Sequence, residues 1–262
     1  MDVFGSVADL YDTARPGYPP DIADAILDYH GAVPASVVEI GAGTGKGTEV
    51  LATIGAVLTC IEPDPRMAAR LSAKYPQARV HIGTFEEWSP PPGGVDVVAC
   101  AMAWHWLDPG SRNARARNAL APGGTLALFG HRYDYANPEQ AAAIQDAVQA
   151  LDSTATERRA DWMYDDVVAG GQFTDVQLQR TRRDLPLDRD RYLALVRTWG
   201  PFLTRPPELQ RRGLDVLGRL IDDFGGTVTM KLQTTLTLGR RRTDTGGTIR
   251  CNEGRAAGHS GV

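Results

Sequence analysis

The chain has 262 residues, of which 42% are hydrophobic and 23% charged, and its formal net charge is −4. This length and composition suit a globular protein with one sizeable core. The acidic balance gives no electrostatic attraction to nucleic acid, and no apolar stretch is long enough to cross a membrane. The N-terminus lacks a basic-then-apolar leader, and the three cysteines lack metal-ligand spacing. We therefore expect a cytoplasmic monomer or homodimer without a metal, a nucleic-acid partner or a membrane partner.

Residues 1–20 show no periodicity but hold an aromatic and proline cluster, in which Tyr11 is followed by RPGYPP at 15–20. We expect this segment to be a loop held by aromatic packing. Asp21 then caps a predicted helix, because the apolar residues at 22, 25, 26 and 29 share one face.

The next stretch, Val37–Leu51, reads VVEIGAGTGKGTEVL and is organised around three glycines. Its first four residues are short and β-branched, which is typical of a buried parallel strand. Glycines alternate at 41, 43 and 45, and helical spacing follows over 44–54. Glycines let a backbone approach a ligand closely, and a helix N-terminus offers unpaired N–H groups. The stretch therefore predicts a nucleotide-binding turn.

Three nucleotide loops compete for this turn, and spacing separates them. A phosphate-binding Walker loop would need glycine where Ile40 stands and a hydroxyl where Gly47 stands. The dinucleotide fingerprint would need a third glycine at Lys46. The spacing Glu39-x-Gly-x-Gly-x-Gly instead resembles motif I of the class I S-adenosylmethionine-dependent methyltransferases. An NAD(P)-dependent oxidoreductase remains the alternative, because both folds place an acidic residue such as Glu62 after the next strand.

Predicted strands and helices alternate along the next part of the chain, with strands at 56–61, 79–82, 95–100 and 125–129. Helices are expected from about residue 65 and over 109–120. A helix with apolar positions 144, 148 and 151 follows, then a polar connector and a strand at 173–178. Two amphipathic helices precede a final half-buried strand over 228–238. The polar, glycine-rich residues 243–262 are expected to be a disordered tail.

The resemblance to the methyltransferases extends over about residues 4–240 and implies the fold. It implies an α/β, Rossmann-like sheet of seven strands, mostly parallel, with a C-terminal antiparallel hairpin and helices on both faces. A small helical cap would be inserted at about 185–226 of a single domain spanning 21–242. Residues 1–20, with the phrase YDTARPGYP, resemble the segment that covers the cofactor in a small-molecule branch of this family.

The same resemblance assigns roles to individual residues. Arg15 would pair with the methionine carboxylate of S-adenosylmethionine, and Glu62 would accept both ribose hydroxyls. Thr84 stands where the family often has an aspartate that binds the adenine amino group, which weakens that match. The full set expected to bind S-adenosylmethionine is Tyr11, Arg15, Tyr18, Glu39, Gly41, Ala42, Gly43, Thr44, Gly45, Glu62, Pro63, Met67, Thr84, Phe85, Glu86, Ala101 and Met102.

A histidine between two tryptophans follows the strand at 95–100, where ligands of open α/β sheets bind. This string resembles the AxHW-type motif of the same methyltransferase branch. His105 is therefore the candidate base or acceptor-orienting group. Trp104, Trp106, His131 and Tyr133 are candidate substrate contacts. Alternatively, the tryptophans are packing residues and His105 is a satisfied hydrogen-bonder.

The favoured function is transfer of a methyl group to a small-molecule acceptor by in-line displacement. The acceptor atom is expected to be an oxygen, which belongs to either a hydroxyl or a carboxylate. Positioning of the acceptor beside the methyl group supplies most of the rate enhancement of such a reaction, so no covalent catalyst is needed. A non-catalytic protein that binds S-adenosylmethionine is the second alternative beside the oxidoreductase.

Overall fold

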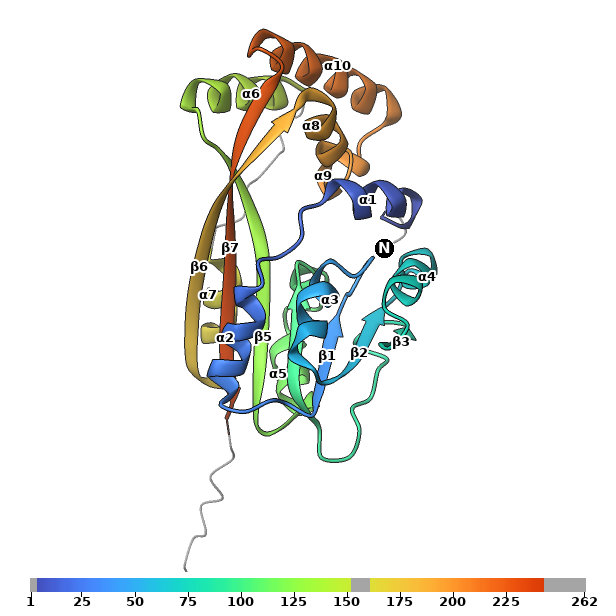
Figure 1. Cartoon of the computed structure of the whole chain (residues 1–262), viewed down its shortest axis with the longest axis vertical. Coiled ribbons are helices and arrows are strands. Elements are labelled where there is room, and N and C mark those ends of the chain that lie inside the picture. Colours follow the sequence, from blue (N-terminus) through green and yellow to red (C-terminus); the bar gives the residue numbers. More distant parts are fainter. Residues whose placement is uncertain (1–3, 152–160, 243–262) are drawn as a thin grey trace, which may run out of the picture.

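The computed structural model describes residues 4–151 and 161–242. The disordered tail expected over 243–262 lies outside these residues. Seven strands of this part of the chain form one sheet in the order β3-β2-β1-β4-β5-β7-β6 (Figure 1). The strands are β1 Ser36–Ile40, β2 Val57–Glu62, β3 Arg79–Ile82, β4 Val95–Ala101, β5 Leu120–Tyr135, β6 Phe173–Asp188 and β7 Thr227–Arg241.

The direction of the strands confirms the predicted fold. β1 pairs in parallel with β2 and β4, β2 with β3, and β4 with β5. β7 lies between β5 and β6 and runs antiparallel to both. The central parallel strands β1 and β4 are mostly apolar because both of their faces are covered. Val37 and Val38 show this, because each is at most 2% exposed and they pack into different clusters.

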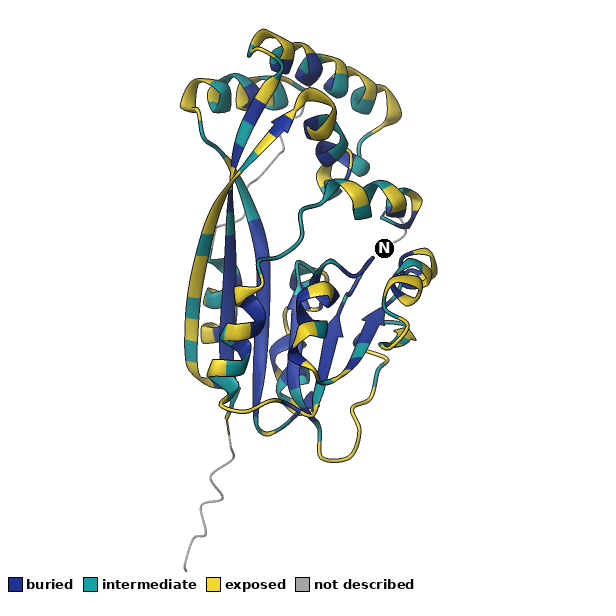
Figure 2. Cartoon of the chain, viewed as in Figure 1, coloured by how far each residue is buried: buried dark blue, intermediate teal, exposed yellow. Residues whose placement is uncertain are grey.

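Helices cover the two faces of the sheet. On one face lie α2 Asp21–His30, α3 Lys46–Leu51 and the 3-10 helix η2 Ala52–Ile54. On the other lie the 3-10 helix η3 Trp104–Trp106, α5 Arg112–Ala119 and α7 Trp162–Gly170. α4 Pro65–Lys74 follows β2 and is capped by Asp64, whose carboxylate accepts from the N–H of Arg66 at 2.8 Å. Figure 2 shows the buried strands between these partly exposed helices.

The long strands β5, β6 and β7 extend past the rest of the sheet and carry a helical cap (Figure 1). The cap contains α6 Pro138–Leu151, α8 Arg189–Val196, α9 Gly200–Leu203 and α10 Pro207–Asp223. It has its own apolar cluster, in which Ile144, Tyr192 and Ile221 pack with Met230 of β7. Among the described residues, no helix has the length and apolar character that a membrane span requires.

Three expectations about these elements were wrong. The N-terminal loop contains the 3-10 helix η1 Gly5–Val7 and the helix α1 Ala8–Ala14, which is joined to α4 by the ion pair of Lys74 with Asp12 at 2.7 Å. Residues 185–188, expected in the cap, continue β6, because β7 pairs with that strand as far as Asp188. The predicted polar connector includes α7, while its residues 152–160 lie outside the described part.

Candidate cofactor and acceptor site

A cavity of about 1270 Å³ lies at the carboxyl ends of β1, β2, β4 and β5. Ligands of open α/β sheets bind at this edge because the parallel strands deliver their loops there. Side chains of α1 and of the cap segment after α8 complete the wall, so the cavity lies between the sheet and the cap. Most of the cofactor and acceptor residues predicted from sequence line it.

The glycine turn after β1 forms one wall. Gly41, Gly43 and Gly45 have φ angles of +64°, +59° and +94°, which only glycine adopts without strain. A Cβ on Gly41 would lie 2.4 Å from the Cβ of Ala103, whereas one on Gly43 would meet no described atom within 4 Å. The backbone at Gly43 therefore faces open cavity, as a close approach to a ligand requires.

Glu62 fixes the next part of the wall at the end of β2. Its Oε2 accepts from the N–H of Gly43 at 2.8 Å, and its Oε1 accepts from the N–H of Asp64 at 2.9 Å. Burial raises the pKa of this carboxyl, and the two backbone N–H groups partly offset that rise. Each oxygen keeps a lone pair that a ribose hydroxyl can use. Pro63 and Met67 line the cavity beside it.

The segment after β3 supplies the part predicted to bind adenine. Thr84, Phe85 and Glu86 line the cavity, and the Phe85 ring is almost fully buried. The Thr84 hydroxyl donates to the Glu87 carboxylate at 2.9 Å, so this hydroxyl is already committed. The backbone N–H of Thr84 is used as well, because it donates to the Glu87 carboxylate at 3.0 Å.

The turn after β4 brings Ala101, Met102, His105 and Trp106 to the cavity. Met102 has a φ of +57°, a conformation that costs energy in a residue with a side chain. Its N–H donates to the carbonyl of Phe129 at 3.0 Å, which holds the turn on β5. The Trp106 ring is 46% exposed, and its centroid lies 4.7 Å from that of His105.

Trp104 does not line the cavity, so its predicted contact with substrate was wrong. The side chain is fully buried beneath the turn, and its Nε1 donates to the Asp166 carboxylate of α7 at 2.8 Å. Arg112 also pairs with Asp166, and its Nη1 donates to the carbonyl of Trp104 at 3.2 Å. This network fixes the turn that presents His105.

Five residues predicted to bind the cofactor also lie away from the cavity lining: Tyr18, Glu39, Ala42, Thr44 and Gly45. Glu39 is fully buried behind the glycine turn, where its Oε2 accepts from the Thr48 hydroxyl at 2.5 Å. Burial raises the pKa of Glu39 to about 8, so the folded protein holds it neutral at pH 7. Tyr18 stacks on His131, with ring centroids 4.3 Å apart.

Arg15 and Tyr11 of the N-terminal segment do line the cavity. The Arg15 guanidinium lies 5.1 Å from the Tyr11 ring centroid and donates to Thr198 of the cap. Sequence reasoning missed Thr198, which holds Arg15, and its neighbour Trp199, which lines the cavity. No local pattern connects them to Arg15, which is 183 residues from Thr198 along the chain.

The cavity wall opposite the glycine turn is formed by β5, β7, α7 and the cap. Predicted substrate residues His131 and Tyr133 lie here, together with Trp162, Met163 and Trp199. The Nδ1 of His131 lies 2.9 Å from the Thr234 hydroxyl. Burial, aided by the Arg183 guanidinium, lowers the pKa of His131 to about 3, so its ring is neutral at pH 7. Within the described residues, no group of His, Cys, Asp or Glu could hold a metal ion.

Comparison with known proteins agrees with this geometry. A methyltransferase-domain family model matches residues 38–128. An uncharacterized methyltransferase of Mycobacterium tuberculosis H37Rv is 31% identical over 218 residues, which are 83% of this chain and 85% of that protein. An uncharacterized methyltransferase of Schizosaccharomyces pombe is 31% identical over 130 residues, or 49% of this chain and 52% of that protein.

Solved structures share the fold at low sequence identity. One assigned as a type II methyltransferase from Anaeromyxobacter dehalogenans has a TM-score of 0.68 and 19% identity, over 86% of this chain and 97% of its own. Phosphoethanolamine N-methyltransferase 2 of Haemonchus contortus, in complex with S-adenosylhomocysteine, has a TM-score of 0.53 and 12% identity, over 91% of this chain and 58% of its own. The chain belongs to the class I S-adenosylmethionine-dependent methyltransferases, with S-adenosylmethionine as cofactor.

Proposed function

We propose that this chain transfers a methyl group from S-adenosylmethionine to an oxygen of a small-molecule acceptor. The observation that carries the proposal is one continuous cavity. Gly43 and Glu62 lie on its cofactor side, and His105 lies where β4 ends. Membership in the methyltransferase family excludes the oxidoreductase alternative.

The residues of the cavity fit S-adenosylmethionine. The open space at Gly43 allows close approach to the backbone, and Glu62 offers a carboxylate anchored on both oxygens. Phe85 and Met67 offer apolar surface for adenine, and Arg15 offers a guanidinium for the methionine carboxylate. When bound, S-adenosylmethionine supplies a methyl group made electrophilic by its sulfonium.

The chain's own part in the reaction is to position the acceptor, exclude water and accept a proton where the acceptor is a hydroxyl. Orientation of bound partners is worth about 7–11 kcal/mol. His105 takes the proton from a hydroxyl acceptor, a role worth about 10²–10⁴-fold in rate, or orients an acceptor that is already ionised. Aromatic faces of Tyr11 and Trp106 favour a cation in the cavity.

The test is calorimetric titration of the purified chain with S-adenosylhomocysteine, followed by measurement of S-adenosylhomocysteine release in the presence of small-molecule acceptors. We expect micromolar binding, and at least about 10-fold weaker binding for Glu62→Gln. Glu49→Gln, on the exposed side of α3, is the matched control. Absence of binding by the wild type would refute the proposal. Binding without turnover of any acceptor would instead favour the non-catalytic alternative.

A further inference from the structure

Three polar side-chain atoms are buried in the wall opposite the glycine turn, and none has a close hydrogen-bond partner among the described residues. They are the Oη of Tyr133, the Nε1 of Trp199 and the Nε2 of His131. All three side chains line the cavity. The Arg15 side chain also interacts with the Tyr133 hydroxyl, and the backbone of Gly17 and Pro16 interacts with His131. The Tyr133 ring centroid lies 6.0 Å from that of Trp199 and 6.3 Å from that of His131. The three groups therefore form one contiguous patch, which we call the donor patch.

A buried polar group without a partner destabilises the folded state, and such groups are rare in folded proteins. Three neighbours of this kind in one cavity wall indicate that their partner comes from the cavity. The patch also borders Arg15, whose guanidinium lies 6.0 Å from the Tyr133 ring centroid. The side chains around the patch are apolar or aromatic and include Trp162, Met163 and Pro201.

The chemistry of the patch specifies a hydrogen-bond acceptor. Trp199 Nε1 can only donate. Burial raises the pKa of Tyr133, so its phenol keeps its proton and can donate. His131 is neutral, and its Nε2 donates in the tautomer in which Nδ1 accepts from Thr234. No carboxylate occurs among the described lining residues of β5, β7, α7 and the cap. The carboxylates that do line the cavity are Glu62 at the end of β2, Asp64 just after it, Glu86 after β3 and Asp108 after η3.

On this basis we propose that the donor patch binds a carboxylate of the methyl acceptor, and that the acceptor is an apolar or aromatic carboxylic acid. The inference rests on the proposed function and names its substrate class. A singly charged, planar carboxylate suits a set of neutral donors, because Arg15 is assigned to the methionine carboxylate of the cofactor. A phosphate, with its greater charge, would favour a cluster of cationic side chains instead.

The test compares acids with the amides that have the same shape but no charge. The probes are trans-cinnamate with trans-cinnamamide and phenylacetate with phenylacetamide. Each is titrated calorimetrically into the full chain, with and without saturating S-adenosylhomocysteine. We expect each acid to bind at least about 10-fold more tightly than its amide. Tyr133→Phe and Trp199→Phe, which remove one donor each and keep the ring, should weaken acid binding about 5- to 20-fold and change amide binding less than about 2-fold.

Tyr135→Phe is the matched control, because it removes a β5 hydroxyl that bonds to Tyr192 and does not line the cavity. It should leave the binding of acids and amides unchanged. Three results would overturn the inference: equal affinity for acids and amides, no binding of either acid, or acid binding that both donor variants retain in full. Loss of S-adenosylhomocysteine binding with the acid preference intact would count against the proposed function and not against the donor patch.

Discussion

Arg15 and Thr198 join the N-terminal segment to the helical cap. The Nε of Arg15 donates to the Thr198 hydroxyl at 2.8 Å, and its Nη2 donates to the Thr198 carbonyl at 2.9 Å. Thr198 is fully buried, and its own hydroxyl donates to Leu195 of α8 at 2.6 Å. The side chain predicted to hold the cofactor is thus also the link between two segments that enclose the cavity.

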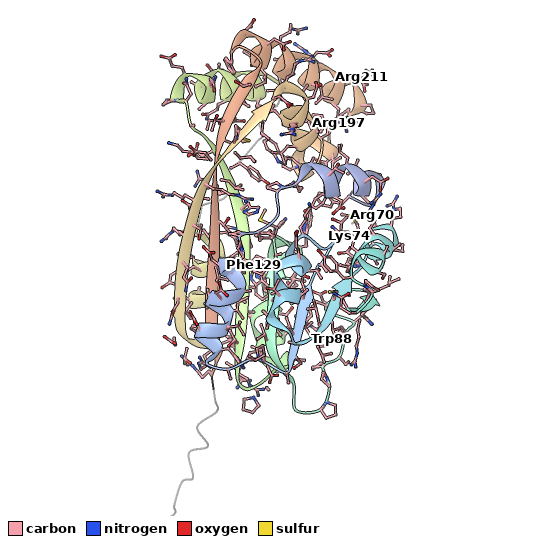
Figure 3. All side chains as sticks on the ribbon, in the orientation of Figure 1. Arg70, Lys74, Trp88, Phe129, Arg197 and Arg211 are labelled. Carbon is pink, nitrogen blue, oxygen red and sulfur yellow. The ribbon has the colours of Figure 1, made fainter. Side chains whose placement is uncertain are left out.

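Arg15→Lys should raise the KM for S-adenosylmethionine about 10-fold, because an ammonium cannot reproduce the paired bonds of a planar guanidinium. Thr198→Val separates the two roles of Arg15, since it removes one bond of the link and leaves the guanidinium in place. The lysine variant should therefore be the more strongly affected. Arg197→Lys, at the exposed neighbour labelled in Figure 3, is the control. Equal effects of the lysine and valine variants would show that Arg15 serves the cap alone.

Gly43→Ala should weaken S-adenosylhomocysteine binding at least about 10-fold, while costing only about 1–2 kcal/mol of stability from its left-handed backbone. The cause is the methyl group placed in open cavity where the cofactor is expected. Gly31→Ala is a close control, because Gly31 also has a positive φ, +87°, and no described atom within 4 Å of its added Cβ, but lies outside the cavity. Calorimetry and thermal melting of the two variants should separate backbone strain from occlusion. Similar affinities in both would place the cofactor elsewhere.

Glu39→Gln should be more stable than the wild type at neutral pH. The folded-state pKa of Glu39, raised to about 8 by burial, lies above its unfolded value of about 4.5. Wild-type stability is therefore greatest below about pH 4.5 and falls as the pH rises toward 8, by about 1.4 kcal/mol per pH unit. Glutamine keeps an acceptor for Thr48 and does not ionise, so the gain at pH 7 should be about 3 kcal/mol.

Urea unfolding of both proteins at pH 5, 6, 7 and 8 measures this difference. Glu49→Gln, on the exposed face of α3, should show no comparable dependence on pH. A constant difference between Glu39→Gln and the wild type from pH 5 to 8 would mean that Glu39 is already ionised in the folded protein.

The sequence was informative where a local pattern and the chain order determined the structure. The φ angles at Gly41 and Gly43 follow from the glycine spacing, and Glu62 reaches the cavity because β2 ends beside the turn. The alternation of strands and helices indicated the parallel strands, whereas the seven-stranded sheet was expected from the family resemblance. These features depend on neighbours within about twenty residues, which a single sequence displays.

Other features depend on contacts that a single sequence does not display. Trp104 and Trp106 flank His105 symmetrically in the sequence, but the 3-10 turn buries the first and exposes the second. β6 extends as far as Asp188 because β7 pairs with it over that length. The residues of β6 are mostly exposed and lack a strong apolar alternation, so the sequence did not indicate this length (Figure 2). Trp199 reaches the cavity through the fold of the cap, so no sequence pattern near β5 or Arg15 indicated it.

Asp166→Asn should lower the free energy of unfolding by about 3 kcal/mol, because it leaves the Arg112 guanidinium without its charged partner. Burial tends to raise the pKa of Asp166, but hydrogen bonds from Arg112, Trp104 and Asn113 outweigh it and lower the pKa overall. The stabilisation is thus present above the unfolded pKa, about 3.9, and is lost as the pH falls below it. Chemical unfolding at pH 7 and pH 3 measures this loss, and Asp165→Asn on the exposed side of α7 is the control. An unchanged stability at pH 7 would show that the network is dispensable.

His105→Ala should lower kcat about 10²–10⁴-fold with a hydroxyl acceptor, because the positioned proton acceptor is lost. With an acceptor methylated on a carboxylate, which is already ionised, the loss should stay below about 10-fold. Affinity for S-adenosylhomocysteine should change less than about 2-fold in either case, which separates chemistry from cofactor binding. The control is His81→Ala, at an exposed histidine of β3. Unchanged kcat with both classes of acceptor would remove His105 from the reaction and leave it as a packing partner of Trp106, whose ring it already contacts.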